Sequence, residues 1–473
     1  MSKSNQDKTY QFSKGFQSID DEIEHSELKV DGHFPEWLNG SLIRTGPGLF
    51  ELEHQNYKHW FDGLALLHKF QINNGEVAYR NKFLKSDSYV LGKKNGKISI
   101  KEFATDPCQN LFQKVKSFFV PPRPTDNGNI NIITYHDQLL ATTETPLPII
   151  FDKSTLKTIE HFDYKDDLAG QIESAHPLYD KDGFIYNCLL KMGAMSFYQV
   201  YKMDPQNCKR EVIAKIPRIE PSYMHSIGMS QNFIILAEFP YLINPYELMF
   251  AGKPLIENYH WKPEKGTNYI IINKKTGKRT SFKSESVFGF HHVNAFEQEN
   301  QLMIDFVGFN DPTIIEALYL KDVQKGKPIQ AAGYLMRTCI DLKDKKISTF
   351  KLADKLIELP RINDKNFTAK PYRFVYGAGN TEAGNYLDDI TKIDIDAGTS
   401  IKWYELGCYP SEPVFIQDPE SKTEDDGILL SVVLDTNNEN TFLLALNTKD
   451  LKEIARATVQ KIIPFSYHGQ FIN

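Results

Sequence analysis

Four histidines stand in short motifs of small or apolar residues that lie far apart in the chain. They are His176 in SAHP, His225 in MHS, His291 in FHHVN and His468 in YHG. An imidazole without a partner is costly to bury, so each of them needs a hydrogen bond or a ligand. For any one of them alone, a hydrogen-bonded core histidine is the simpler interpretation. If the four meet, an all-imidazole site would suit iron, zinc, copper or nickel, and the ligands alone do not choose among these metals.

The tandem pair of histidines lies in a stretch that reads as a β-strand. Residues 287–296 (VFGFHHVNAF) are rich in aromatic and β-branched side chains and contain an early glycine. Neighbouring side chains on a strand point to opposite faces. At most one of the pair can face a given centre, and we expect it to be His291.

Three glutamates could orient such histidines. A metal-bound imidazole commonly donates its other ring N–H to a carboxylate. Glu144 in TTETP, Glu358 in LIELP and Glu412 in PSEPV all sit among apolar residues and prolines. An ordinary exposed glutamate beside a proline turn is the alternative for each.

A recurring turn indicates how such distant residues are brought together. A strand ends in an apolar residue plus Asp or Asn, a polar turn follows, and a second strand begins. Asp and Asn suit these turns because their side chains bond to nearby backbone. Copies recur about every 50 to 70 residues, near the length of a four-stranded blade, at Asp152, Asp204, Asn273, Asp341, Asp394 and Asn447.

These repeats favour an all-β fold, a β-propeller whose inner strands all approach one axis. A pair of β-sandwiches is the alternative, because sandwiches use the same hairpins. We prefer the propeller because no linker divides the chain. We expect a polar N-terminal lead over residues 1–30, followed by a single propeller domain over residues 31–473.

Composition narrows the function classes. The chain has 473 residues, a formal net charge of −6 and 41% hydrophobic residues. No basic block suggests nucleic acid. The five cysteines are scattered and odd in number, which fits a reducing compartment rather than a disulfide framework. The polar N-terminus lacks the apolar core of a signal peptide, and no apolar run would cross a bilayer. We expect a cytoplasmic protein.

Two insertions are more apolar than the rest. Residues 108–124 mix Leu111, Phe118 and Phe119 with Lys114 and Lys116, which matches an interfacial helix with a basic side. Residues 239–250 (FPYLINPYELMF) form a second apolar loop. Packing on the body of the protein and contact with a membrane surface are equally good interpretations of both.

Taken together, the motifs resemble the carotenoid cleavage oxygenase family, which includes β-carotene central-cleavage dioxygenases and a retinoid isomerohydrolase. The resemblance runs from about Gly32 to Phe471 and is similar in wording to the animal branch. It is carried by many segments in the same order, including LIRTGPGLFE (42–51), HWFDGLALLHKF (59–70), TTET (142–145), ESAHP (173–177), FHHVNAFE (290–297), YPSEPVF (409–415) and YHGQF (467–471).

The resemblance implies a seven-bladed propeller whose loops and short helices form a cap over an axial non-haem Fe(II) (Fe2+). It implies that His176, His225, His291 and His468 bind the iron. Glu144, Glu358 and Glu412 would orient His225, His291 and His468 in that order, which leaves His176 without a carboxylate. Ile130 matches a position near the vacant coordination site, and Phe103 and Thr143 match positions that line the substrate tunnel. Cys108 matches a cysteine that is lipidated in a relative.

The activity implied by the resemblance is oxidative cleavage of one C=C bond of a carotenoid or apocarotenoid by O2. The products would be aldehydes, with cleavage at the central 15,15′ bond giving retinal. Because the polyene comes from a bilayer, we expect a peripheral contact with membrane. Retinoid isomerohydrolysis and cleavage of a stilbene-type alkene on the same iron stay open, as does a non-enzymatic lipid-binding propeller.

Overall fold

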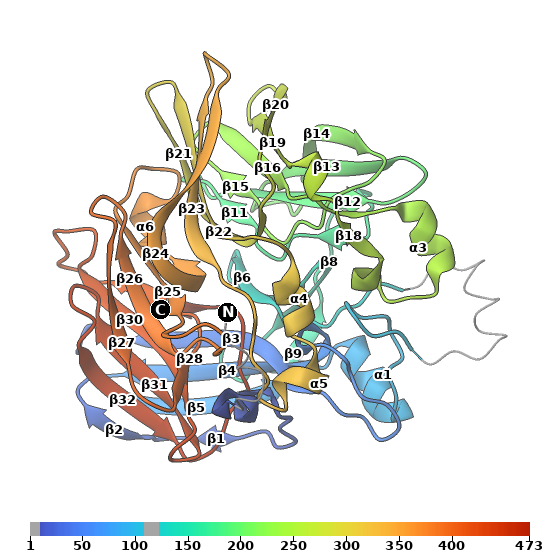
Figure 1. Cartoon of the computed structure of the whole chain (residues 1–473). Helices are drawn as coiled ribbons and strands as arrows, with labels where there is room; N and C mark the ends of the chain where they lie inside the picture. Colours follow the sequence, from blue (N-terminus) through green and yellow to red (C-terminus); the bar gives the residue numbers. More distant parts are fainter. Residues whose placement is uncertain (1–9, 108–122) are drawn as a thin grey trace, which may run out of the picture.

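The computed structural model describes residues 10–107 and 123–473, which fold almost entirely as β-sheet around one axis. In Figure 1 the sheets follow one another round the molecule in chain order, from blue at the bottom through green to red at the left. One sheet of seven strands is two blades that share a strand, so the described residues form seven blades. The predicted propeller is confirmed, and a pair of sandwiches is excluded.

The first four blades follow the chain with their inner strands nearest the axis. Blade 1 runs β33 (Gly469–Ile472), β3 (Gly40–Leu49), β4 (Leu64–Asn73), β5 (Glu76–Phe83) and β1 (Glu24–His25). Blade 2 is β6 (Asn131–Tyr135), β7 (Gln138–Thr143), β8 (Thr145–Phe151) and β9 (Thr158–His161). Blade 3 has β10 (Ile172–Glu173), β11 (Leu178–Tyr179), β12 (Ile185–Lys191), β13 (Ser196–Met203) and β14 (Arg210–Arg218). Blade 4 has β15 (Gly228–Met229), β16 (Phe233–Glu238), β19 (Thr267–Asn273) and β20 (Arg279–Ser284).

The remaining blades share or exchange strands. Blade 5 is β21 (Phe288–Gln298), β22 (Gln301–Phe309), β23 (Tyr334–Asp341) and the first part of β24 (Ile347–Arg361). The end of β24 begins blade 6, with β25 (Phe374–Gly379), β26 (Asp389–Asp394) and β27 (Thr399–Tyr404). Blade 7 is β28 (Cys408–Pro410), β29 (Val414–Gln417), β30 (Gly427–Asp435), β31 (Asn440–Asn447), β32 (Glu453–Val459) and β2 (Lys29–Gly32).

The two ends of the chain close the ring. The C-terminal strand β33 pairs with β3, with Arg44 opposite Gly469. The N-terminal strand β2 pairs with β32, with Gly32 opposite Ala455. Blade 1 therefore contains strands from both ends of the sequence, and blade 7 takes its outer strand from the beginning of the chain.

The lead expected over residues 1–30 differs from the structure in its described part. The 3-10 helix η2 (Gln11–Phe16) buries Phe12 and Phe16 completely. The ring of Phe16 packs edge-on against Trp60, Tyr386 and Phe465. Polar residues flank these aromatic side chains in the sequence, so the segment reads as polar. Its buried rings nevertheless belong to the core of the propeller.

All six predicted turns join the third and fourth strands of a blade, counted from the axis. In each, the Asp or Asn side chain accepts hydrogen bonds from backbone N–H groups two or three residues later. Blade 1 makes the same connection with a tighter turn, in which Asn74 and Gly75 both have positive φ. The period of the sequence is therefore the period of the blades.

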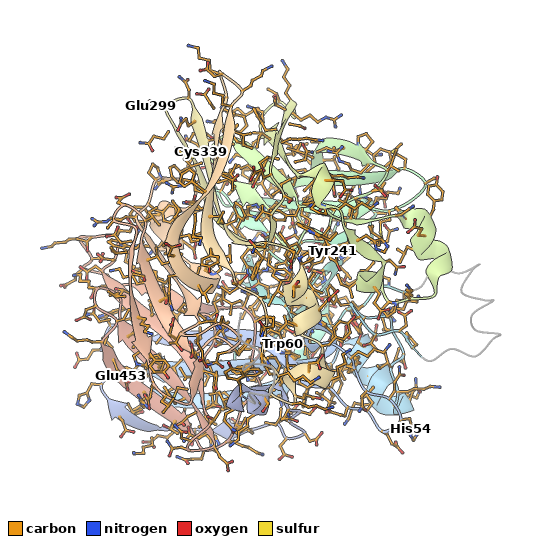
Figure 2. The ribbon with its side chains drawn as sticks, viewed as in Figure 1. His54, Trp60, Tyr241, Glu299, Cys339 and Glu453 are labelled. Carbon is orange, nitrogen blue, oxygen red and sulfur yellow. The ribbon has the colours of Figure 1, made fainter. Side chains whose placement is uncertain are left out.

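A cap of loops and short helices covers one side of the axis. Its elements are α1 (Asp87–Asn95), α3 (Pro245–Ala251), α4 (Thr313–Ala317), α5 (Leu320–Val323), η3 (Trp60–Asp62), η4 (Leu255–Asn258), η5 (Pro263–Lys265) and the ribbon β17 (Tyr241–Ile243) and β18 (Tyr259–Trp261). The short helix α6 (Asp364–Phe367) lies away from the cap, where Phe367 O accepts a hydrogen bond from Asn294 Nδ2 of β21. Asp62 ties two cap loops together, because its carboxylate accepts bonds from His59 N–H, Ala104 N–H and the Thr105 hydroxyl. In Figure 2, Trp60 of η3 lies in the interior, whereas Glu299 and Glu453 lie at the outer rim.

Of the two apolar insertions, the structure describes mainly the second. Residues 108–122, with Cys108, Lys114 and Lys116, lie outside the described residues. In the second insertion, Phe239, Tyr241 and Ile243 are buried against the body, while Tyr246 is 51% exposed. No helix within residues 10–107 and 123–473 has both the length and the apolarity needed to cross a bilayer.

Candidate metal centre

The structure brings His176, His225, His291 and His468 together on the propeller axis. His176 lies between β10 and β11, His225 just before β15, His291 within β21, and His468 just before β33. One ring nitrogen from each lies within 4.8 Å of the others. The Nε2 atoms of His176 and His225 are 3.1 Å apart, and those of His291 and His468 are 3.2 Å apart. Imidazole nitrogens bound to one metal at about 2.1 Å and at right angles would lie about 3 Å apart.

Each of three histidines has a glutamate behind it, in the order that the resemblance implies. His225 Nδ1 lies 2.7 Å from Glu144, His291 Nδ1 lies 2.6 Å from Glu358, and His468 Nδ1 lies 2.7 Å from Glu412. An ionised carboxylate can only accept, so each Nδ1 carries the proton and each Nε2 is left with a lone pair.

The facing lone pairs show that the cluster suits a cation. A neutral imidazole that carries its proton on Nδ1 has no hydrogen on Nε2, so neutral rings of His291 and His468 could not hydrogen-bond across the 3.2 Å between these two atoms. Burial lowers the pKa of His468 to about 4, although Glu412 acts in the opposite direction, so this ring is neutral at pH 7. A metal ion between the nitrogens would satisfy both lone pairs. The donor set therefore fits a metal site.

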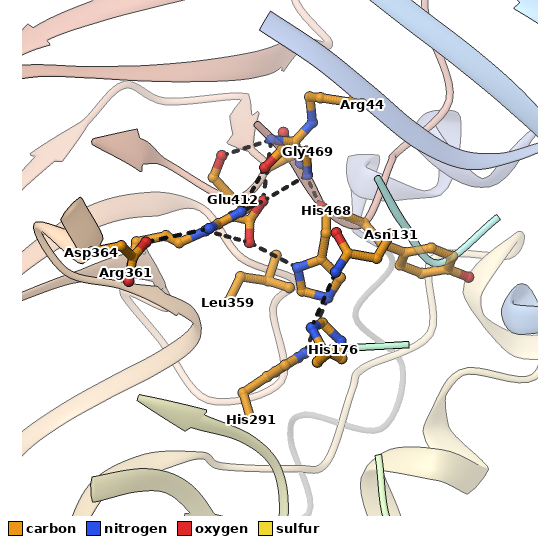
Figure 3. Close-up of polar contacts among 12 residues, drawn as sticks. Arg44, Asn131, His176, His291, Leu359, Arg361, Asp364, Glu412, His468 and Gly469 are labelled. Carbon is orange, nitrogen blue, oxygen red and sulfur yellow. Dashed lines mark hydrogen bonds and ion pairs between the residues drawn. The ribbon is translucent and has the colours of Figure 1, made fainter. Parts of the chain in front are cut away.

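Two arginines distinguish Glu412 from the other glutamates (Figure 3). Arg361 donates to both of its carboxylate oxygens at 2.9 and 3.2 Å, and Arg44 Nη1 lies 3.7 Å from Oε2. Burial alone would raise the pKa of Glu412, but Arg361, His468 and Arg44 hold it well below its usual range. Neither arginine was among the residues predicted for the site. An arginine within the apolar strand motif LIR was the available signal, since a buried guanidinium needs an anion.

A bulge in β24 aims two of these side chains at the centre. The pairing of β24 with β25 shifts register between Glu358 and Arg361. Between them Leu359 has a φ of 50°, which is unusual for a residue with a branched side chain. The shift directs Glu358 to His291 and Arg361 to Glu412. Bulges of this kind re-aim side chains beside functional sites.

His176 has a different environment from the other three histidines. Among the described residues no carboxylate bonds to it, and Asn131 Nδ2 lies 3.5 Å from its Nδ1. The Asn131 amide donates to Ala175 O at 3.0 Å and accepts from Ile132 N–H at 2.8 Å. Burial lowers the pKa of His176 well below its usual value, and the three other histidines add to this effect. His176 is therefore a neutral imidazole, which could offer a ring-nitrogen lone pair to a metal.

Aromatic rings surround the cluster on the side of the cap. Phe290 lies 5.4 Å from the His225 ring, and Phe61 lies 6.2 Å from Phe290, between ring centroids. Phe61 also contacts Phe103 at 5.2 Å and Tyr467 at 5.5 Å. This aromatic belt of Phe61, Phe103, Phe290 and Tyr467 joins the cap to the metal centre. Phe61, Phe290 and Tyr467 lie within the motifs that carry the family resemblance, but the sequence predicts a substrate-lining role only for Phe103.

Ile130 and Thr143, the other two residues expected near the metal, each lie next to a residue of the centre. Ile130 is buried, and its carbonyl accepts from the backbone N–H of His468 at 3.3 Å. Thr143 is buried at the end of β7, next to Glu144. His292 is on the other face of β21, where its Nδ1 lies 2.8 Å from the Ser226 hydroxyl.

A seven-bladed propeller with a buried cluster of four histidines defines a class of metalloproteins, and comparison with known proteins identifies the family. Residues 16–473 match the family model described as retinal pigment epithelial membrane protein. The chain belongs to this family, the carotenoid oxygenases.

Individual relatives agree with that assignment. The chain is 34% identical to a mitochondrial carotenoid-cleaving dioxygenase of Mustela putorius furo, over 94% of this chain and 93% of the relative. It is 33% identical to the β,β-carotene 15,15′-dioxygenase of Mus musculus, over 96% and 90%. The crystal structure of cobalt-substituted Synechocystis apocarotenoid oxygenase superposes with a TM-score of 0.85 at 25% identity, covering 98% of each chain.

Proposed function

We propose that this protein is an Fe(II)-dependent dioxygenase that cleaves one C=C bond of a carotenoid or apocarotenoid. The reaction consumes O2 and gives two carbonyl compounds, one oxygen atom going to each carbon of the broken bond. The observation that carries the proposal is the meeting of four imidazoles on one axis, three of them held by glutamates. The dioxygenases among its relatives support the substrate class.

The side chains of the centre have separate tasks. His176, His225, His291 and His468 would hold Fe(II), which when bound supplies the redox chemistry with dioxygen. Glu144, Glu358 and Glu412 keep the proton on Nδ1 and so present Nε2 to the metal. Arg361 and Arg44 compensate the buried charge of Glu412.

The aromatic belt is the proposed wall of the substrate site. Its rings offer an apolar surface to a polyene and exclude water from the centre. Phe103 belongs to the belt, and we assign Thr143 to the same wall because it adjoins Glu144. The methyl groups of Ile130 would keep a sixth ligand off the metal. An Ile130→Ser protein with unchanged O2 reactivity and metal geometry would contradict that role.

Cleavage at the central 15,15′ bond, giving retinal, is the regiospecificity we propose, and the mouse relative supports it. The experiment is aerobic incubation of the iron-loaded protein with β-carotene, apocarotenoids, a retinyl ester and a stilbene, followed by identification of the products. Retinal from β-carotene is the expected result. A retinyl ester converted to retinol isomers, or a stilbene cleaved instead, would replace the proposal with that activity. Iron-loaded protein that alters none of them would overturn it, and His291→Ala is the inactive control.

We also propose that the protein works in the cytoplasm at a membrane surface, because its polyene substrate dissolves in bilayers. Flotation with phosphatidylcholine liposomes tests this. Protein that rises with the vesicles is the expected result, and protein that stays entirely in the soluble fraction would contradict it.

A further inference from the structure

The segments that carry the four histidines belong to separate blades, so the hydrogen bonds within the sheets do not hold these segments together. Among the residues that the structure describes, the backbones of blades 3 and 4 pair only through an isolated parallel bridge, from His176 to Ser226. A metal site nevertheless needs its ligands held to within about half an ångström. Something besides the sheets must set the distance between one histidine and the next.

Hydrogen bonds that all run in the same direction supply this link from blade 1 to blade 5. The donors are His468 N–H to Ile130 O at 3.3 Å, Asn131 Nδ2 to Ala175 O at 3.0 Å, Ser174 Oγ to His225 O at 2.7 Å, and Ser226 Oγ to Phe290 O at 2.6 Å. Every bond joins one blade to the next and lies within two residues of a histidine of the cluster. We call this series the inter-blade collar.

The two serines make the shortest links of the collar. The Ser174 hydroxyl donates to the carbonyl of His225 and accepts the N–H of His176 at 3.1 Å, so it touches the backbone of two cluster histidines. The Ser226 hydroxyl donates to Phe290 O and accepts the N–H of His292 at 3.0 Å.

Ser226 therefore forms hydrogen bonds with the backbone on both sides of His291, at Phe290 and at His292. The pairing of β21 with β22 is irregular at this point, with register shifts on either side of His292. The serine hydroxyl takes the place of ladder bonds there. Both serines are buried, with exposures of 5% and 6%, so water does not compete for these contacts. A hydroxyl is suited to the task because it donates and accepts at once.

We propose that Ser174 and Ser226 are positioning residues that set the spacing of His176, His225 and His291, and thereby the geometry and affinity of the metal site. This inference rests on the proposed metal-binding function. Without the hydroxyls, neighbouring inner strands would be free to move apart, because facing nitrogen lone pairs repel each other when no cation lies between them. Metal binding would then have to bring the strands back.

The test uses Co(II) as the probe, with affinity measured by competition with a chelator and geometry by the visible absorption bands. Ser174→Ala and Ser226→Ala are expected to bind Co(II) about 10- to 100-fold more weakly, as for other groups that orient ligands, with shifted bands. Ser226→Thr keeps the hydroxyl and is expected to restore both readouts. It also serves as the second variant if an alanine protein folds poorly.

Tyr269→Phe is the matched control. Thr338 Oγ1 donates to the Tyr269 hydroxyl at 2.8 Å, in another buried link between blades 4 and 5 that involves none of the cluster residues. Its removal is expected to lower thermal stability while leaving cobalt affinity and spectrum unchanged.

The outcomes separate this inference from the proposed function. Folded alanine variants that bind Co(II) within twofold of wild type, with the same spectrum, would overturn the collar. Weaker binding in Tyr269→Phe to the same degree would also overturn it, because the effect would then be general loosening. Wild-type protein that binds no Co(II) would overturn the metal site and the collar together. Metal-loaded protein that cleaves no carotenoid would overturn only the proposed reaction, since the cobalt comparison still decides the collar.

Discussion

At the scale of single residues, the three glutamates behind the histidines differ in their surroundings. Glu412 has 2% of its side chain exposed and lies between Arg361 and Arg44, whereas Glu144 is 17% exposed and bonds to His225 and the Tyr223 hydroxyl. The negative charge of Glu412 therefore balances the positive charges of two arginines, whereas the charge of Glu144 has no such partner among the described residues.

This difference predicts unequal costs of neutralising the two side chains. In the metal-free protein, Glu412→Gln should lower the free energy of unfolding by about 3 kcal/mol, because the buried guanidinium of Arg44 loses its anion and the part-buried Arg361 is left with Asp364. Glu144→Gln should cost less than about 1 kcal/mol, although both should weaken metal binding. Urea denaturation measures this, and equal costs would contradict the assigned role of the arginines.

A buried histidine of blade 1 predicts a pH dependence of stability. Burial, with a contribution from Arg44, lowers the pKa of His68 to about 3, and its Nδ1 lies 2.9 Å from the Tyr79 hydroxyl. Its folded-state pKa is below the unfolded value of about 6.5. The stability gained by keeping His68 neutral in the folded protein is therefore fully present above pH 6.5. It is lost as the pH falls toward the folded pKa of His68.

Between pH 7 and pH 4 the loss from His68 should be about 3 kcal/mol. His68→Gln keeps a polar partner for Tyr79 but does not titrate, so the metal-free variant should lose that much less stability over this range. His54→Gln is the control, since His54 is 63% exposed. A His68→Gln protein with the acid sensitivity of wild type would contradict the prediction.

At the scale of elements, turn chemistry made the blades predictable. Six turns were found from an Asp or Asn at the end of the third strand, and that side chain does bond to the following backbone. The seventh, at Asn74 and Gly75, was missed because its two-residue connection lacks the polar spacer.

The turn at Asp341 predicts a measurable contribution to stability. Its carboxylate accepts from Lys343 N–H at 2.9 Å and Asp344 N–H at 2.7 Å. Asp341→Ala should lower the free energy of unfolding by about 1 kcal/mol. Lys343→Ala leaves both backbone donors and the acceptor in place and should have little effect in the same urea titration. Equal effects of the two substitutions would argue against the side-chain bonds.

The bulge in β24 shows what the sequence could not reveal at this scale. Nothing in the local pattern of LIELPR predicts that Leu359 adopts a positive φ, since glycine or asparagine would be the usual signal. The conformation depends on long-range contacts of Glu358 and Arg361, with His291 and Glu412. The role of Arg361 therefore could not be predicted from the sequence, whereas the glutamates were predictable from their motifs.

At the scale of the whole molecule, all seven blades contribute to one centre. Blades 1, 3, 4 and 5 supply histidines, and the segments of blades 2, 6 and 7 supply Glu144, Glu358 and Glu412. The order of the motifs was predictable from the sequence. The closure was not, because the strand β2 that pairs with β32, and the buried aromatic residues before it, lie in a stretch that reads as polar.

This N-terminal segment predicts a large effect for a residue far from the metal centre in sequence. Phe16 is fully buried against Trp60, Tyr386 and Phe465. Phe16→Ala should lower the free energy of unfolding by about 4 kcal/mol through lost packing. Leu406→Ala, at a residue 75% exposed, is the control. If Phe16→Ala were as stable as wild type, the segment would be a lead and not part of the propeller.

The most direct test of the four-histidine metal site is X-ray absorption at the iron edge of the Fe(II)-loaded protein. We expect four nitrogen neighbours at about 2.1 Å, with the outer-shell scattering of imidazole rings, and three such rings in His468→Ala. Iron surrounded only by oxygen neighbours, or a spectrum that His468→Ala leaves unchanged, would contradict this site.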